Sequence, residues 1–205
     1  MQHPAIAVFD FDETLTTKHS LRPFIRYVAG TPRFMGGVLR ASPWLAASAV
    51  HLVDRGTAKA RFLRATIQGR TRSELESKAQ QFATERLPTI IRPEMAFRVQ
   101  EHVRRGHQLV LASASPGLYL RPWATRAGFQ AVLATEFEFV DERFTGRLAT
   151  PNCRGKEKAK RLQEWLSDRP RGLLCAYGDN RGDREMLAMA DRPWKRGDGA
   201  LPRLE

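Results

Sequence analysis

The stretch AVFDFDETLT, residues 7–16, places acidic side chains directly behind a short apolar run. The run Ala5–Phe9 predicts a buried strand, and Asp10, Asp12 and Glu13 follow at its end. Carboxylates beside buried residues are costly unless a partner compensates their charge. Side chains alternate along an extended chain, so Asp10 and Asp12 face the same cavity. A hard cation such as Mg²⁺ would relieve the repulsion of these carboxylates, and a phosphate would complete the charge balance. The alternative for this stretch alone is a solvated turn after an edge strand, and the later motifs described below favour the cation.

Apolar runs bounded by turn-forming residues recur along the chain, at Leu109–Ala112, Val132–Thr135 and Leu173–Tyr177. Residues 92–106 and 156–166, which lie between such runs, have the periodicity of amphipathic helices. Short apolar strands alternating with helices predict an α/β fold with a doubly wound parallel sheet. In open sheets of this kind ligands bind at the carboxyl ends of the strands, where the first acidic cluster lies.

Residues 21–92 interrupt this alternation, because they have helical patterns without a convincing strand between them. We therefore expect a helical subdomain at 21–92, inserted into a core that consists of residues 1–20 and 93–205. A small β-hairpin appended to that core is expected at 136–148, where residues alternate at period two around Asp141 and Glu142.

One helix of the insert is expected from Trp44 to Val53, with Ser42 as its N-cap, Pro43 at its first position and Gly56 as its stop. The helix is almost entirely apolar. Its dozen residues would reach roughly 18 Å, which is short of the ~30 Å hydrocarbon core of a membrane. We expect it to be buried within the insert, and the alternative is a helix that lies on a membrane surface.

The chain of 205 residues carries 34 Lys and Arg against 22 Asp and Glu, a net charge of +12. Such a charge favours anionic partners, whether phosphate esters, nucleic acid or an acidic lipid surface. The basic residues are scattered, however, so a generally basic surface explains the charge equally well. Two cysteines, Cys153 and Cys175, exclude a disulfide framework, and the first residues have no secretory signal pattern. The expected location is the cytoplasm.

Three later positions carry groups that could serve the same site. Ser113 follows an apolar strand, where a hydroxyl and backbone N–H groups can hold a phosphate oxygen. Asp179 follows the strand ending at Tyr177, and Asp183 lies one helical turn onward, so both could add carboxylates to a Mg²⁺ site. The stretch NCRGKEKAKRL, residues 152–162, offers a lysine that could neutralise developing negative charge.

The order of these motifs resembles the haloacid dehalogenase superfamily of phosphohydrolases. DFDETLT comes first, then a serine after an apolar strand, then a Gly-x-x-Lys helix and finally GDNRGD. GHQLVLASASP, NCRGKEKAKRL and YGDNRGDREMLAMAD are similar to the phosphoserine-phosphatase-like subfamily IB, and the similarity covers nearly the whole chain. The resemblance implies a Mg²⁺-dependent phosphatase whose insert forms a cap over the site.

The resemblance assigns roles to the two aspartates of the first motif. Asp10 would be the nucleophile that forms an aspartyl-phosphate, and Asp12 the general acid and base. The carboxylates of Asp10 and Asp179 and the backbone carbonyl of Asp12 would bind Mg²⁺. Glu13 receives no role in the chemistry.

The supporting residues follow from the same resemblance. Ser113 would bind the phosphoryl oxygens, Thr14 would steady the loop, and Asp183 would orient the metal ligands. The family spacing Gly-x-x-Lys-x-x-x-Leu selects Lys158, while Lys156 remains the alternative.

The substrate would be a phosphomonoester. The apolar cap helix, the basic charge and the stretch at 191–205 resemble lipid-phosphate members, of which bacterial phosphatidylglycerophosphatase C is the nearest. That resemblance implies peripheral contact with an anionic membrane at its inner face, through apolar and basic residues of the cap: Trp44, Leu45, Val50, Leu52, Arg33, Arg40 and Arg55.

Two alternatives stay open at this point. One is a soluble phosphomonoester such as phosphoserine or histidinol phosphate under an ordinary cap. The other is a basic nucleic-acid-binding protein on the same fold, although no basic stripe is interleaved with aromatic residues as single-strand binding would require. The phosphatase interpretation is therefore favoured over nucleic-acid binding.

Overall fold

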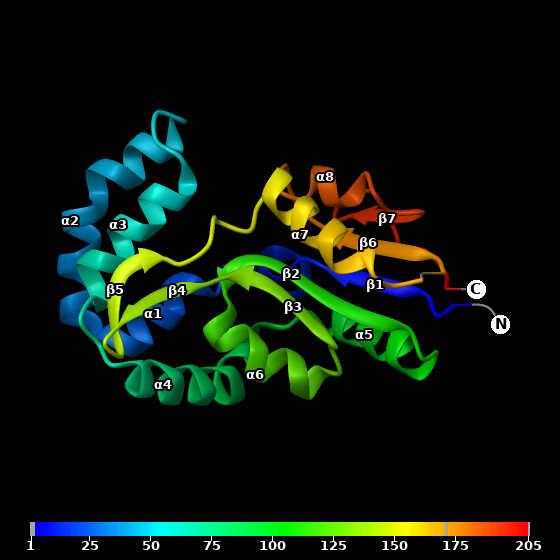
Figure 1. The fold of residues 1–205 in the computed structure, drawn as a ribbon, viewed down its shortest axis with the longest axis horizontal. Coiled ribbons are helices and arrows are strands. Elements are labelled where there is room, and N and C mark those ends of the chain that lie inside the picture. Colours follow the sequence, from blue (N-terminus) through cyan, green and yellow to red (C-terminus); the bar gives the residue numbers. More distant parts are fainter. Residues whose placement is uncertain (1–2, 171, 205) are drawn as a thin grey trace.

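A five-stranded parallel sheet forms the middle layer of the protein (Figure 1). This computed structural model describes residues 3–170 and 172–204. The strand order is β3-β2-β1-β6-β7, and the neighbouring strands pair in parallel. The strands are β1 (Ile6–Phe9), β2 (Gln108–Pro116), β3 (Ala131–Thr135), β6 (Leu174–Gly178) and β7 (Arg192–Lys195). The predicted parallel sheet is confirmed.

Helices cover both faces of this sheet (Figure 1). On one face lie α5 (Pro93–Arg104) and α6 (Gly117–Ala127), and on the other α7 (Lys156–Ser167) and the short α8 (Arg184–Leu187). Ala7 and Phe9 of β1 belong to the apolar cluster that includes α5 and α6, whereas Ile6 and Val8 belong to the cluster with α7 and α8. The alternation of side chains along a strand thus buries both faces, as in a doubly wound fold.

After the short turn η1 (Phe11–Leu15) at the end of β1, four helices and one further helical turn fill the sequence up to α5. They are α1 (Leu21–Ala29), α2 (Thr31–Ala49), α3 (Arg55–Ile67), α4 (Arg72–Glu85) and η2 (Leu87–Ile90). The chain leaves the core and returns to it through two paired segments. Thr17 N donates to Ile90 O at 2.8 Å, and Arg92 N donates to Leu15 O at 2.8 Å. The domain boundaries at 20/21 and 92/93 remain a prediction.

The hairpin predicted at 136–148 is confirmed. β4 (Phe137–Val140) and β5 (Arg143–Leu148) pair antiparallel. Asp141 and Glu142 at its turn both have positive φ, 45° and 57°, the left-handed conformation of the tightest hairpin turns. The hairpin also contacts the insert, since the Cβ of any residue at Gly146 would lie 3.0 Å from the Cα of Arg64.

The prediction that a helix begins at Ser42 and Pro43 is wrong. Helix α2 runs without a break from Thr31 to Ala49 and contains Pro43 in its interior. Pro43 has no N–H to donate to the Leu39 carbonyl one turn earlier. The Ser42 hydroxyl donates to that oxygen instead, at 2.8 Å. The helix can therefore continue past the proline, because the neighbouring side chain replaces the lost hydrogen bond.

The stop assigned to Gly56 is also wrong. Helix α2 already ends at Ala49, and Gly56 lies in the first turn of α3. The Asp54 carboxylate caps this turn by accepting hydrogen bonds from Gly56 N at 2.8 Å and Thr57 N at 3.0 Å. Asp54 is thus a helix N-cap, and the glycine behind it begins a helix.

The prediction that the apolar helix is buried within the insert is wrong for its outer side. Leu39 is 76% exposed and Leu52, just beyond the helix, is 80% exposed, and Met35 and Val50 are also exposed. The fully buried residues of α2 are small or polar: Gly37, Ala41 and Ser48. Within residues 3–170 and 172–204, no helix combines the length and apolar character needed to cross a membrane. Helix α2 therefore packs through a few small or polar residues, and its large apolar side chains on the outer side are exposed to solvent.

The packing of α2 against α3 yields a test with a matched control. A Cβ at Gly37 would clash with Thr66 Cγ2 and lie 3.1 Å from the Ala65 carbonyl oxygen, whereas a Cβ at Gly36 meets nothing within 4 Å. We expect Gly37→Ala to lower the free energy of unfolding by about 1–3 kcal/mol through overpacking. Gly36→Ala should instead raise it by about 0.5–1 kcal/mol, because alanine favours helix. Denaturant unfolding measures both, and equal effects would contradict the packing.

Candidate active site

The acidic and basic side chains singled out in the sequence meet at the carboxyl ends of β1 and β6. Phe9 of β1 pairs with Tyr177 of β6, so Asp10 and Asp179 follow neighbouring strands almost side by side. Phe9 also pairs with Leu111 of β2, and Ser113 lies further along that strand. The register of a parallel sheet therefore brings residues more than 160 positions apart to one edge.

Lys158 lies at the centre of this edge, between two carboxylates. Its Nζ donates to Asp10 Oδ1 at 2.7 Å and to Asp183 Oδ1 at 2.6 Å. Asp10 is 5% exposed, Lys158 2% and Asp183 1%. Lys156, the first residue of the same helix, is exposed. Of these two lysines, the structure places Lys158 against the acidic residues.

Burial and neighbouring charge shift the protonation of this cluster. Burial raises the pKa of Asp10 to about 7, against the lowering effect of Lys158. Burial alone would lower the pKa of Lys158, but the carboxylates of Asp10 and Asp183 outweigh it and hold that pKa above its ordinary value. Lys158 is therefore a permanent positive charge, whereas Asp10 carries a charge that is costly at this depth.

Asp183 also fixes the turn after β6. Its Oδ2 accepts hydrogen bonds from the backbone N of Asp179 at 3.1 Å and of Asn180 at 3.2 Å. Although burial would raise its pKa, Lys158 and these two backbone groups lower it below the ordinary value. Asp183 is thus an ionised carboxylate that holds Asp179 in place.

Three carboxylates come close enough together to bind one cation. Asp10, Asp179 and Asp183 each offer an oxygen within 4.8 Å of the others. Thr14 bridges two of them, because its hydroxyl is 3.1 Å from Asp10 Oδ2 and 3.4 Å from Asp179 Oδ1. Carboxylate oxygens are the donors that Mg²⁺ prefers. The donor set therefore fits the predicted metal, and burial, which raises the pKa of Asp179 as well, supplies the electrostatic need for a cation.

The carboxylate of Asp12 has hydrogen-bond partners outside this cluster. Its Oδ1 accepts a hydrogen bond from Ser20 N at 2.6 Å, and its Oδ2 accepts one from the Ser115 hydroxyl. The tight turn η1 (Phe11–Leu15) allows this arrangement, because Glu13 adopts a left-handed φ of 65°. The side chains of Asp10 and Asp12 thus have different partners at the same loop.

Ser113 lies inside β2 and not just past the end of its strand, because β2 extends to Pro116 and α6 begins only at Gly117. The pairing of β2 with β3 shifts between Ser113 and Pro116, which bends the strand end. Ser113 is buried, and its Oγ accepts a hydrogen bond from Ser115 N at 3.1 Å.

Sequence reasoning missed several residues at the site. Ser115 could have been found from its position two residues after Ser113, since side chains two apart share one face of a strand. Lys59 of α3 could not, because it reaches the core from the insert. Its Nζ donates to the Ala114 carbonyl at 2.6 Å and to the Asn152 side chain, and burial lowers its pKa to about 8.

Arg154 is a second cation that the sequence analysis missed. Its guanidinium donates to Asn180 Oδ1 at 2.8 Å, which places it beside the loop that carries Asp179. Burial, followed by the charge of Arg55, lowers its pKa. Arg154 and Arg55 both line a cleft of about 520 Å³ between the start of α3 and the loops before α7 and after β6. At the carboxyl ends of the strands, buried carboxylates are thus surrounded by the cations Lys59 and Arg154.

Comparison with known proteins agrees with this arrangement. The family described as haloacid dehalogenase-like hydrolase matches residues 7–188. The chain belongs to the haloacid dehalogenase-like hydrolase family. Protein CicA of Caulobacter vibrioides is 39% identical over 189 residues, which cover 92% of this chain and 84% of CicA. The resemblance found in the sequence is therefore confirmed at the level of the family.

Solved structures share the fold. A Bordetella pertussis Tohama I protein with unknown function has a TM-score of 0.79 and 22% identity, over 93% of this chain and 89% of that one. A phospho-aspartyl intermediate analogue of phosphoserine phosphatase has a TM-score of 0.65 and 16% identity, over 95% and 86% of the two chains. The predicted fold class is confirmed, and the family confirms that the protein is a hydrolase of the haloacid dehalogenase type. That it acts as a phosphatase stays a prediction.

Metal binding should depend on pH through Asp10. Protons and Mg²⁺ compete for its carboxylate, which is protonated below its pKa of about 7. We therefore expect the apparent Mg²⁺ affinity to rise about tenfold from about pH 6 to about pH 8 and then level off. At ten times the dissociation constant, Mg²⁺ should raise the free energy of unfolding by about 1.4 kcal/mol. Calorimetric titration and thermal melts measure the two effects.

The control for metal binding uses an aspartate far from the site. Asp179→Asn should weaken Mg²⁺ binding at least about tenfold. Asp141→Asn, in the hairpin turn, removes the same charge, and asparagine tolerates its positive φ. Equal affinity in both variants would show that Mg²⁺ binds elsewhere.

Proposed function

We propose that the protein hydrolyses phosphomonoesters with Mg²⁺ and through an aspartyl-phosphate on Asp10. The observation that supports this most directly is the buried carboxylate of Asp10 at the end of β1, in contact with Lys158 and within reach of Asp179 and Asp183. A carboxylate nucleophile divides the hydrolysis into two displacements at phosphorus. The phospho-aspartyl analogue of a phosphoserine phosphatase with the same fold supports this chemistry.

In the first displacement, the Asp10 carboxylate attacks phosphorus and the bond from phosphorus to the ester oxygen breaks. Asp12, in its protonated form, donates a proton to the departing alcohol. In the second, water attacks the phosphorus of the aspartyl-phosphate, Asp12 accepts a proton from that water, and phosphate leaves as Asp10 is restored. The hydrogen bonds from Ser20 N and Ser115 keep the Asp12 carboxyl near the nucleophile but apart from Lys158.

The remaining residues hold charge and position. We assign Lys158, and not Lys156, to the neutralisation of charge on the transferring phosphoryl group, because Lys158 is the one in contact with Asp10. Ser113 would bind a phosphoryl oxygen from β2. The carboxylates of Asp10 and Asp179, with the Asp12 carbonyl, would hold Mg²⁺, which supplies charge stabilisation for phosphoryl transfer. Thr14 and Asp183 would orient these carboxylates.

The insert, residues 21–92 in our assignment, would form the cap that selects the leaving group. A pocket of about 340 Å³ lies among α1, α2 and α3 and contains Lys59, whose Nζ reaches Ala114 beside Ser113. Its described lining includes Arg22, Arg55 and Lys59 but no acidic residue. Such a pocket suits a leaving group with an anionic part, and it lacks a carboxylate for an ammonium group such as that of phosphoserine.

The apolar surface of α2 favours a lipid phosphate as the substrate. Met35, Leu39, Val50 and Leu52 are exposed on one outer side of the insert, and exposed apolar patches mark sites of interaction. The sequence from Thr14 to Val53 has no acidic residue, which suits contact with anionic headgroups. The enzyme would then work in the cytoplasm at the inner face of the membrane. The alternative, a soluble phosphomonoester, has the phosphoserine phosphatase relatives in its favour.

The nucleophile can be tested with Asp10→Asn. We expect kcat for p-nitrophenyl phosphate with Mg²⁺ to fall at least about 10⁴-fold, because the amide cannot form the aspartyl-phosphate. Glu13→Gln, in the same loop, is the matched control and should stay within about threefold of the wild type. Activity that survives in Asp10→Asn would move the nucleophile elsewhere.

The substrate class can be tested by comparing phosphoserine, histidinol phosphate and phosphatidylglycerophosphate in micelles. If the apolar surface contacts lipid, Leu39→Ser with Leu52→Ser should lower the ratio of micellar to p-nitrophenyl phosphate activity at least about tenfold, since each leucine contributes about 1.5–3 kcal/mol when buried. Phe97→Ser with Val140→Ser removes two other exposed apolar residues, 60% and 56% exposed, from the core and the hairpin. A preference for a soluble ester, or equal loss in both pairs, would favour the soluble alternative.

A further inference from the structure

A second hollow on the described surface lies outside the active site. It is a groove of about 700 Å³ between α1 and the segment formed by the end of α4 and η2. None of the carboxylates of the site, nor Lys158 or Ser113, lines it. Its volume is within the range of sites that bind small molecules.

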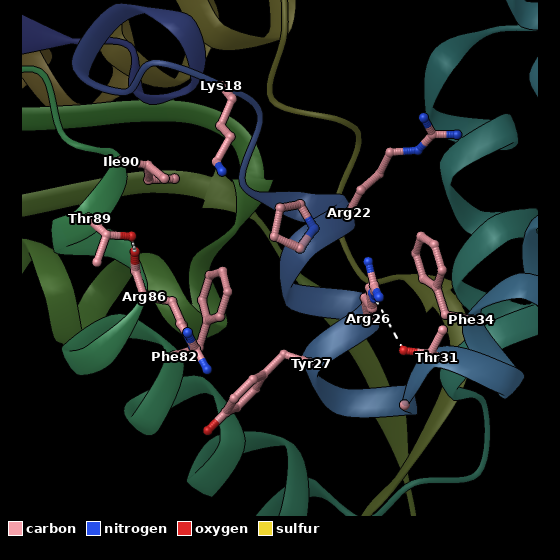
Figure 2. A pocket seen from close by; sticks show the side chains of 12 residues that line it. Lys18, Arg22, Arg26, Tyr27, Thr31, Phe34, Phe82, Arg86, Thr89 and Ile90 are labelled. Atoms are coloured by element: carbon pink, nitrogen blue, oxygen red, sulfur yellow. Dashed lines mark hydrogen bonds between the residues drawn. The ribbon is translucent and has the colours of Figure 1, made fainter.

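The groove carries positive charge without acidic partners. Lys18, Arg22, Arg26 and Arg86 line it, and no described lining residue is acidic. None of the four forms an ion pair with a carboxylate in residues 3–170 or 172–204. Figure 2 shows the side chains of Lys18, Arg26 and Arg86 around the hollow, on three sides of it. Arg22 extends away from the middle and also lines the pocket that contains Lys59.

The placement of these charges opposes the stability of their own helix. Arg22 lies in the first turn of α1, where the helix dipole disfavours a cation and where no acidic residue is present. Arg26 lies one turn later, and two like charges at this spacing weaken a helix. An anionic ligand that binds Arg26 in the groove would reduce this repulsion.

Aromatic rings form the apolar wall of the same groove. Tyr27, Phe34 and Phe82 line it (Figure 2). Tyr27 is held in place by a hydrogen bond from its hydroxyl to Gln81 Oε1 at 3.1 Å, and its ring contacts Phe82. Rings that are fixed in this way present apolar area at low entropic cost. The groove therefore combines basic side chains, which can bind an anionic group, with an apolar surface for a hydrocarbon chain.

We propose that this groove is a second binding site, separate from the catalytic centre, for an amphiphile that carries a phosphate group. Lys18, Arg26 and Arg86 bind the phosphate, since arginine and lysine donors match its oxygens. Tyr27, Phe34 and Phe82 pack against the apolar part. The ligand is either a free amphiphile or a headgroup at the surface of a bilayer, which share this chemistry.

The test uses a ligand that a phosphomonoesterase does not cleave. Dihexanoyl phosphatidylglycerol, a phosphodiester, is titrated below its micellar concentration into the full chain, and calorimetry measures the affinity. We expect Lys18→Gln with Arg86→Gln to weaken binding at least about tenfold through the loss of two charge-assisted contacts. Arg147→Gln with Arg196→Gln, two exposed cations on the hairpin and core, removes the same charge and should change the affinity less than about twofold.

Two further measurements distinguish a free amphiphile from a bilayer headgroup and test the role of the acyl chains. Glycerophosphoglycerol, which lacks the acyl chains, should bind at least about tenfold more weakly than the dihexanoyl compound. Co-sedimentation with vesicles of phosphatidylglycerol and phosphatidylcholine, but not of phosphatidylcholine alone, would assign the groove to a bilayer headgroup. Binding of the monomer without binding of the vesicles would assign it to a free amphiphile.

The outcomes separate this site from the proposed catalysis. Asp10→Asn should bind dihexanoyl phosphatidylglycerol as the wild type does, because the groove shares no residue with the catalytic centre. The proposal is overturned if the wild type binds neither the monomer nor the vesicles. It is also overturned if the groove variant and its charge-matched control bind equally, with circular dichroism showing that both are folded.

Discussion

The ammonium of Lys158, buried between Asp10 and Asp183, is the interaction on which the rest of the site depends. Breaking a buried pair of this kind leaves an uncompensated charge, at a cost of roughly 3–5 kcal/mol. The fold therefore has to deliver α7, β1 and the turn after β6 to one point. Two glycines make that approach possible. Gly155, before α7, has a φ of 59°, and a Cβ at Gly178 would lie 2.7 Å from the Cβ of Asp183.

The charge balance of this cluster explains why a basic protein has an acidic centre. One lysine faces the carboxylates of Asp10, Asp179 and Asp183, so the buried charge stays negative until a cation is bound. A dianionic phosphate could not approach such a centre alone. In the proposed function, a cation at the carboxylates, with Lys59 and Arg154 at the rim, would reverse the local field and make the same place attractive to phosphate. The proposed chemistry therefore requires carboxylates that hold the cation and, around them, basic side chains that attract the phosphate.

Most of the sheet and the acidic centre could be predicted from the sequence, because apolar strands and the motifs at their ends are local patterns. The limits of α2 could not be predicted in this way. Ser42 and Pro43 are typical of a helix start. The bond from the Ser42 hydroxyl to the Leu39 carbonyl, which lets the helix continue past Pro43, cannot be recognised in the sequence. The exposure of Leu39 and the contact of Lys59 with Ala114 depend on how the insert packs on the core, which no local pattern encodes.

The core supplies the acidic side chains of the site, and the insert supplies basic side chains around it. The core contributes the carboxylates that bind a cation, whereas the sequence from Thr14 to Val53, which forms α1 and α2, contains no acidic residue at all. The ammonium of Lys59 does not pair with these carboxylates, because it bonds to a carbonyl and an amide instead. It stays available to anionic ligands. Arg22, which lines both the pocket with Lys59 and the aromatic groove, makes these two basic hollows neighbours on one helix. If the insert is a cap, as we propose, it would select ligands by their negative charge before the core acts on the phosphate.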